Sequence, residues 1–268
     1  MSARLVGVRA KIERAKHHIN DLDNRIISFR GTNPYTLRCD YDSQTGNRVF
    51  RTVVCAAIPD EFAVIAGEAV HQLRSALDHL AWQLVETNGG TPDRDTCFPL
   101  DRKPPSNEAT FARKVQGMSV AAANLIRSKQ PYQPGCEVLG ALHEVDNFDK
   151  HRLLLVAAYG VQQFGFSYRN PILDRDPTFR EIVERFRATV PAPVVSPGLM
   201  FLVPHDGDQV ASIAWPDGPE PQVGEELHLT YEMVFAQPEV VECQPVLPVL
   251  RQFCQAVEDA VHDFESLL

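Results

Sequence analysis

A polar stretch in a predicted helix holds the first group of residues that could do chemistry. At about 100° per residue of an α-helix, His71, Arg74 and Asp78 fall on one side. Arg74 and Asp78 are four residues apart and can form an ion pair, whereas His79 lies about 140° around from Arg74. These side-chain types transfer protons and bind anions. Arg74 and His79 would share a cavity only if a second helix or a second subunit closed it, and the alternative is a solvated face with one ion pair.

The spacing Arg74-x-x-x-x-His79 on a bundle helix resembles the Arg–His motif of the HEPN family, helical-bundle proteins of which many are ribonucleases. In that family the Arg and His of two subunits meet at a dimer interface and cleave RNA without a metal ion, with the 2′-hydroxyl as nucleophile. The resemblance implies that Arg74 is an electrostatic clamp, His79 the acid–base group and Asp78 its orienter. It also implies a homodimer that acts on RNA, which would fit a defence or toxin role.

A second polar stretch, residues 142–152, runs directly into the apolar segment 153–158. Charges that are buried need partners, because their desolvation is costly. One interpretation is an internal network, in which Asp146 pairs with Lys150 and either Asn147 or Asp149 caps a helix. The other is a polar wall that faces the first group and binds a phosphate. In that interpretation the substrate-binding residues are Asn147, Lys150, His151 and Arg152.

The two stretches together resemble a pair of segments found in a group of bacterial proteins. Leu73–Trp82 matches Leu-Arg-Ser-Ala-Leu-Asp-x-Leu-Ala-Trp, and Asp146–Arg152 matches Asp-Asn-x-Asp-Lys-His-Arg. This resemblance implies no activity.

A metal site is the least supported use of these histidines. His71 and His79 are eight residues apart, as are His143 and His151, which separates each pair by roughly 12 Å along a helix axis. Neither pair can chelate a metal alone, so such a site would need one His and one carboxylate from each helix. The chain has no P-loop, dinucleotide-binding fingerprint, H-E-x-x-H or G-x-S-x-G motif, so we expect no nucleotide cofactor.

The elements that would carry these groups follow from apolar periodicity. Apolar residues from Leu5 to Ile26 and from Leu247 to Leu268 recur in steps of three and four, the spacing of helices that pack lengthwise. Two such seams predict that the chain ends pack into one bundle. We therefore predict a single α+β domain, 1–268, with a four-helix-type bundle and inserted antiparallel β-hairpins. The predicted helices are 3–29, 60–87, 137–158 and 245–267, with a short helix at 178–188, and the predicted β insertions are 36–55 and 199–235.

Composition limits the function classes. The net charge of −9 argues against a generic nucleic-acid coat and against binding to an anionic membrane, although it leaves room for a local basic site. The longest apolar stretch, 153–161, is too short to span a bilayer, and we expect no signal peptide. Six cysteines without a Cys-x-x-Cys pair are typical of free thiols in a reducing cytoplasm.

Three functions are compatible with these observations. The first is a HEPN-like, metal-independent ribonuclease or RNA-binding relative without a cofactor. The second is a non-catalytic helical interaction protein. The third is a bundle metal-binding protein.

Overall fold

The computed structural model describes residues 3–104, 108–159, 164–166, 206–214, 227–229, 231–242 and 244–268. The fold is α+β, as predicted, with long helices and small antiparallel sheets. The chain divides into two compact units. The first contains Met1–Ser28, Ile58–Ala157 and Met233–Leu268, and the second contains Phe29–Ala57 and Ala158–Glu232. Most of the predicted β insertions therefore belong to the second unit.

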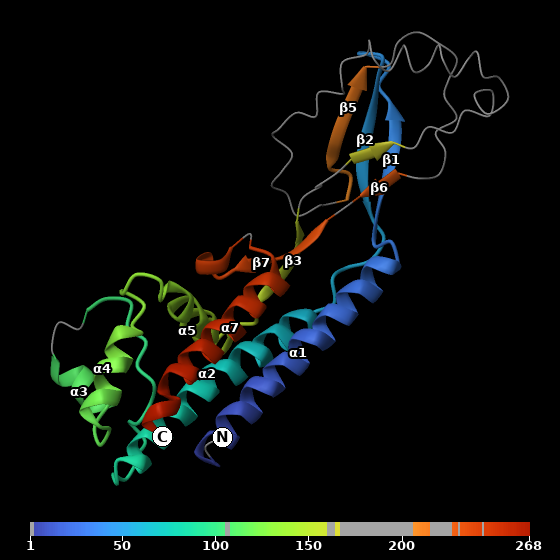
Figure 1. Cartoon of the computed structure of the whole chain (residues 1–268). Helices are drawn as coiled ribbons and strands as arrows, with labels where there is room; N and C mark the ends of the chain where they lie inside the picture. The colour runs from blue at the N-terminus through green and yellow to red at the C-terminus, as the bar shows by residue number, and fades with distance from the viewer. Residues whose placement is uncertain are drawn as a thin grey trace, which may run out of the picture. The chain divides into compact units, whose positions relative to one another are not determined.

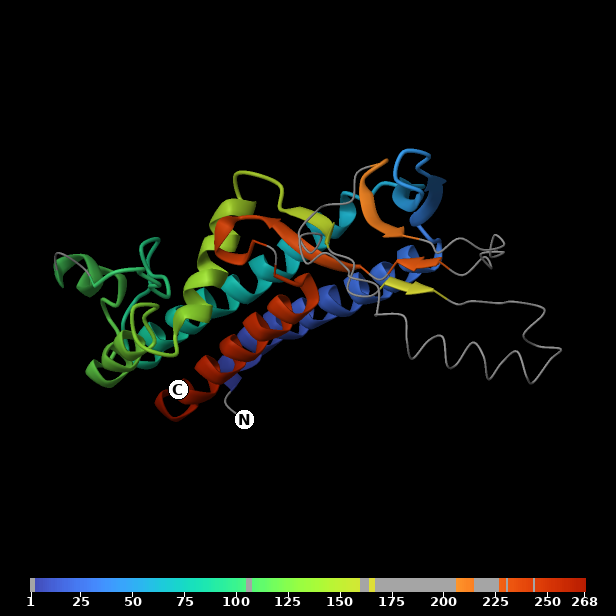
Figure 2. The same ribbon diagram turned by 90° about the horizontal axis from the view of Figure 1, so that it is seen from above.

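The long helices of the first unit form the predicted bundle. They are α1 (Val6–Gly31), α2 (Glu61–Thr87), α5 (Glu137–Asp149) and α7 (Val246–Phe264), with one-turn 3-10 helices at Ala3–Leu5 and Glu265–Leu267. Figures 1 and 2 show α1, α2 and α7 running alongside one another, with both chain ends at the same end of the bundle. Packing of the first and last helices into one bundle is thus confirmed.

The apolar seam of α1 is fully inside the bundle. All seven apolar residues of the predicted seam are buried, the first in the 3-10 helix before α1 and the others in α1: Leu5, Val8, Ile12, Ala15, Ile19, Leu22 and Ile26. Burial of such side chains stabilises the fold by roughly 25 cal/mol for each Å² removed from water. α2 is the central helix, because 15 of its 27 residues are buried, many of them Ala or Gly, which allow its neighbours to approach closely.

Glycines end α2, and a serine caps the start of α4 (Val120–Ser128). Gly89 follows α2 with a φ of +78°, and the Gly90 N–H donates to the Val85 carbonyl at 3.0 Å, which satisfies an orphan carbonyl of the last turn. Two shorter helices lie between α2 and α5. These are α3 (Glu108–Lys114) and α4 (Val120–Ser128), the latter capped by the Ser119 hydroxyl, which accepts the Ala122 N–H.

The predicted helix 137–158 is wrong in its last part. α5 ends at Asp149, and Leu155–Tyr159 is strand β3, which pairs with β7 (Glu232–Gln237). A short apolar run fits a buried strand as well as a buried helix, and its periodicity does not separate the two. Residues 155–159 form a strand because they pair with β7, which is more than 70 residues away in the sequence.

The second unit contains the predicted hairpin. Strands β1 (Tyr35–Tyr41) and β2 (Asn47–Val54) are antiparallel, and β5 (Gln209–Ala214) adds to β2. Asp42 stabilises the hairpin turn, since its carboxylate accepts the Gln44 N–H and the Thr45 hydroxyl, and Gly46 supplies a φ of +71°.

A shorter pair of strands also belongs to this unit. β4 (Phe164–Phe166) pairs with β6 (Leu227–Leu229). The predicted β insertion 199–235 thus ends in two strands, β6 and the first part of β7. A 3-10 turn (Glu239–Val241) precedes α7. The predicted helix 178–188 and the first residues of the predicted β insertion, 199–205, lie outside the described residues.

Candidate functional site

Arg74 and Asp78 form the predicted ion pair, and together they bind a loop. Arg74 is buried, with 6% of its surface exposed, and its Nη1 lies 2.8 Å from Asp78 Oδ1. Its Nη2 donates to the Phe98 carbonyl at 2.8 Å, while Asp78 accepts the Phe98 N–H at 3.0 Å. Both backbone groups of Phe98 are therefore satisfied by charged side chains of α2.

The same loop is held at two further points. Gln130, fully buried, donates to the Pro99 carbonyl at 2.7 Å and accepts the Asp101 N–H at 3.0 Å. The Phe98 ring packs edge-on against Phe264 of α7, with centroids 5.9 Å apart. Burial raises the pKa of the neighbouring Cys97 thiol, which keeps it protonated at neutral pH. Arg74 thus belongs to a set of contacts that fastens residues 97–101 to the bundle.

His79 lies on a different side of α2 from Arg74. It is exposed, and a Cβ at Gly7 of α1 would lie 3.4 Å from its Nδ1. Arg74 instead faces the Phe98 loop. Trp82, one turn further along, is 42% exposed and donates to Glu86. Within one chain, the described residues do not bring Arg74 and His79 into one cavity.

The polar stretch of α5 faces α2, one turn before Arg74. Asp146 is 1% exposed, and its Oδ1 lies 3.2 Å from the Nδ1 of His71 on α2. Its Oδ2 lies 2.5 Å from Lys150 Nζ, the ion pair predicted from their spacing. A buried carboxylate is thus neutralised by a lysine and bound to an imidazole whose side chain is 56% exposed. The carboxylate accepts from Nδ1 and leaves Nε2 of His71 to serve as an acceptor.

His143 and Asn147 occupy the neighbouring turn of α5. Burial, and then the positive charge of Arg74, lower the pKa of His143, so its imidazole is neutral at pH 7. Its Nε2 lies 3.0 Å from the exposed Asn147 amide nitrogen. The contact between His71 and Asp146 shows that the two predicted polar groups lie close together on the facing helices.

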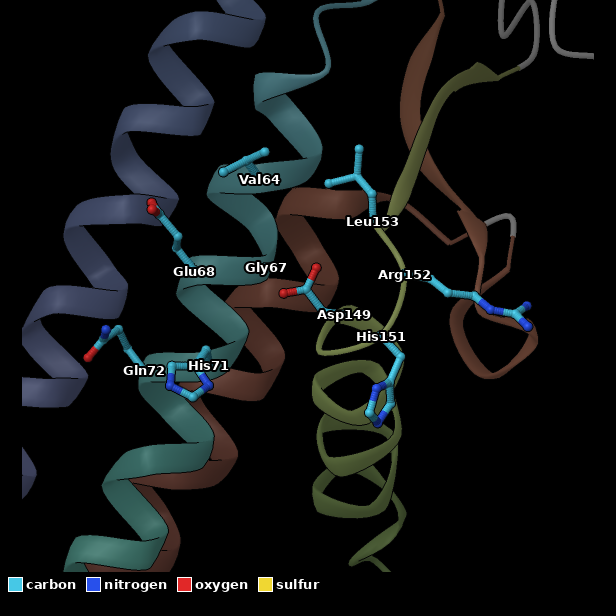
Figure 3. A pocket seen from close by; sticks show the side chains of 9 residues that line it. All are labelled: Val64, Gly67, Glu68, His71, Gln72, Asp149, His151, Arg152 and Leu153. Carbon is cyan, nitrogen blue, oxygen red and sulfur yellow. The ribbon is translucent and has the colours of Figure 1, made fainter.

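A pocket of about 480 Å³ opens where the end of α5 meets the first half of α2 (Figure 3). It is within the usual size range of small-ligand sites. Five of its side chains are ionisable, from α2 and from the end of α5 and the turn that follows. The lining residues are Val64, Gly67, Glu68, His71, Gln72, Asp149, His151, Arg152 and Leu153.

The side chains around the pocket point in different directions (Figure 3). The Asp149 carboxyl group points at α2 beside Gly67, whereas the Arg152 guanidinium extends away from α2. Glu68 lies 3.2 Å from His18 Nδ1, through its Oε2, so its charge is directed toward α1. The other ionisable residues that line the pocket are His71, Asp149 and His151.

Asp149 rests directly on the backbone of α2. A Cβ at Gly67 would lie 2.5 Å from Asp149 Oδ1 and 2.6 Å from its Cγ, so a side chain at this position would displace the carboxyl group. The carboxyl group also accepts the Leu154 N–H. Burial, opposed by that hydrogen bond, raises the pKa of Asp149 above its ordinary value of 3.8.

The structure therefore divides the predicted site residues into three sets. Two of them line the pocket, His151 and Arg152. Two others contact residues of α5, Asn147 and Lys150. Three are not part of the pocket lining: Arg74, Asp78 and His79. Gly67 and Asp149 are pocket residues that the sequence did not predict. The sequence signal for this contact was the glycine inside an otherwise apolar helix. A helix with Gly at an interior position is about 1 kcal/mol less stable than one with Ala, so such a glycine indicates a close packing contact.

The described residues contain no group of three or more His, Cys, Asp or Glu side chains placed to hold a metal ion. Among the described helices, none has the length and apolar composition that a membrane span requires. Comparison of the chain with family models, with curated protein sequences and with solved structures gave no match.

Proposed function

We propose that this chain is a metal-independent ribonuclease whose acid–base groups are the two histidines of the α2–α5 pocket. The observation that carries the proposal is the contact between His71 and Asp146. A half-exposed imidazole bound through Nδ1 to a buried carboxylate has the orientation and tautomer of a general base.

The chemistry requires no group beyond those near the pocket. His71 Nε2 would take the proton of an RNA 2′-hydroxyl, and the 2′ oxygen would then attack the adjacent phosphorus. The bond to the 5′ oxygen breaks, and that oxygen receives a proton from the imidazolium form of His151. The products are a 2′,3′-cyclic phosphate and a 5′-hydroxyl end, and the two histidines have exchanged one proton between them.

The positive charge available for a phosphate-containing substrate is that of Arg152, whose guanidinium would have to turn toward α2. Arg152 lines the pocket and Lys150 follows Asp149, although Lys150 is paired with Asp146. The net charge of −9 opposes RNA at long range, so binding should be strongest at moderate ionic strength, where distant repulsion is screened.

The HEPN-like assignment of Arg74, Asp78 and His79 stays a prediction. A catalytic part for Arg74 would require release of its contacts with Asp78 and Phe98, and a joint action of Arg74 and His79 would require a second copy of the chain. The predicted homodimer is checked by the molecular mass in solution.

The test is cleavage of a mixed panel of single-stranded and hairpin RNA in EDTA at moderate salt. Loss of the general base should slow cleavage by His71→Gln by about 10²–10⁴-fold. His151→Gln should lose a comparable factor, and the matched control is His262→Gln, which alters an exposed histidine of α7.

Other outcomes identify the alternatives. Activity that survives His71→Gln but vanishes in His79→Gln would replace the pocket with the HEPN-like site. RNA binding without cleavage by the wild type would leave an RNA-binding relative. Neither binding nor cleavage would favour the interaction protein, and metal retained after purification would favour the metal-binding protein.

A further inference from the structure

The end of α5 is shaped by one side chain. The N–H groups of His151 and Arg152 both donate to the Phe148 carbonyl, so the helix stops there and the chain turns. Asp149, the last residue of α5, then accepts the Leu154 N–H through its carboxyl group. This hydrogen bond closes a turn that contains His151, Arg152 and Leu153, the three pocket residues contributed by this segment.

The same carboxyl group makes the closest approach of the turn to α2. It occupies the space in which any side chain at residue 67 would begin, with Oδ1 2.5 Å from an ideal Cβ position. Figure 3 shows the carboxyl group pointing from α5 toward the α2 ribbon at Gly67. Asp149 thus fixes the turn internally and seats it on α2.

The contact of Asp149 with Gly67 lies close in sequence to the two pocket histidines, His71 and His151. Gly67 is one helical turn before His71, and Asp149 is two residues before His151. Val64 and Leu153, which are 45% and 46% exposed, line the opposite walls of the same pocket. Any shift of Asp149 away from Gly67 would therefore change the separation of the two histidines and of the two walls.

We infer that Asp149 is the positioning residue of this pocket and that Gly67 has no side chain because Asp149 must rest on the α2 backbone. Asp149 acts through the turn that carries His151, and it takes no proton from the substrate. The catalytic consequence rests on the proposed ribonuclease activity, whereas the structural consequence does not.

The test is a double-mutant cycle of Gly67→Ala and Asp149→Ala, with Asp149→Asn as the conservative variant. Gly67→Ala alone forces an overlap and should lower Tm by at least about 3 °C. In the Asp149→Ala background the overlap is absent, so adding Gly67→Ala should leave Tm unchanged or raise it, because Ala is the better helix former.

Measurements of kcat distinguish a positioning role of Asp149 from a role in stability alone. Because small misplacements of reacting groups are costly, kcat should fall by about 100-fold in Gly67→Ala and in Asp149→Ala. It should stay low in the double variant, even though the Tm of the double variant is no lower than that of Asp149→Ala. Asp149→Asn keeps an oxygen that can accept the Leu154 N–H, so its kcat should stay within about three-fold of wild type.

A spectroscopic measurement keeps the inference testable if the chain proves not to cleave RNA. The imidazole ¹⁵N and ¹H signals of His151 should move in Asp149→Ala and remain near wild-type positions in Asp149→Asn. A double variant with the kcat of wild type would overturn the inference. So would Gly67→Ala with wild-type Tm, or His151 signals that do not respond to Asp149→Ala.

Discussion

Arg74, in the middle of the central helix, donates a hydrogen bond from Nη2 to the backbone carbonyl of Phe98 at 2.8 Å. Asp78, its ion-pair partner, accepts the N–H of the same residue. Two charged side chains thus replace the backbone partners that a loop residue lacks. A spacing that resembles a catalytic motif has a definite structural use in this chain.

Loss of the Arg74 contact should destabilise the protein. Arg74→Met retains most of the side-chain volume but leaves the Phe98 carbonyl without its donor, which should lower the free energy of unfolding by about 2 kcal/mol. Urea denaturation followed by circular dichroism measures the change. Asp78→Asn, whose amide oxygen can still accept the Phe98 N–H, should cost about 1 kcal/mol or less, and an equal cost for both variants would contradict the assignment.

Phe98 joins the loop to the bundle through its ring. The side chain is fully buried against Phe264, so Phe98→Ala should lower the free energy of unfolding by about 3–5 kcal/mol, through lost burial and a cavity. Phe98→Leu should cost about 1.5 kcal/mol or less. Ile27→Ala, at a residue that is 60% exposed, is the control and should stay within about 0.5 kcal/mol of wild type in the same denaturation experiment.

Asp146 and His71 should differ in their effects on stability and activity. Asp146→Ala removes a buried carboxylate that binds two partners, so it should lower both the free energy of unfolding, by about 2 kcal/mol, and RNA cleavage. His71→Gln changes a half-exposed side chain and should alter stability by less than about 1 kcal/mol, while it slows cleavage by about 10²–10⁴-fold. Parallel unfolding and single-turnover assays make the comparison, and a large stability loss in His71→Gln would make that histidine structural.

The pH dependence of stability should contain a contribution from His143. Burial holds its folded-state pKa below the ordinary value of 6.5, so between these two values the folded protein binds fewer protons than the unfolded chain. The contribution is therefore complete above pH 6.5 and is lost as pH falls through that value toward the folded pKa. His143→Gln should lose less stability than wild type between pH 7.5 and pH 5 in urea denaturation.

His18 has a pKa shift of the same sign, again through burial, so the His143 variant should reduce the acid sensitivity and not remove it. An acid sensitivity in His143→Gln equal to that of wild type would show that His143 contributes nothing. The control is His262→Gln, at an exposed position, which should retain the wild-type profile.

Local patterns in the chain were enough to predict three of the bundle helices and the first β-hairpin. Apolar steps of three and four placed α1, α2 and α7 within a few residues of their observed ends, since a helix buries one face and its period appears directly in the sequence. The hairpin β1–β2 was predictable because its turn residues, Asp42 to Gly46, carry their own hydrogen-bonding and backbone preferences. The ion pairs Arg74–Asp78 and Asp146–Lys150 followed from helical spacing alone.

The sequence by itself therefore determined the α+β class, the bundle helices and the ion pairs within α2 and within α5. Only the tertiary structure decided their uses, because contacts between residues far apart in the chain have no local period. The backbone of Phe98 binds Arg74 and Asp78. Pairing with β7 makes the end of the third predicted helix a strand, β3. Asp149 contacts the α2 backbone at Gly67, which is 82 positions away in the sequence. Each outcome depends on which backbone or side chain lies opposite, and that is settled by packing of the whole bundle.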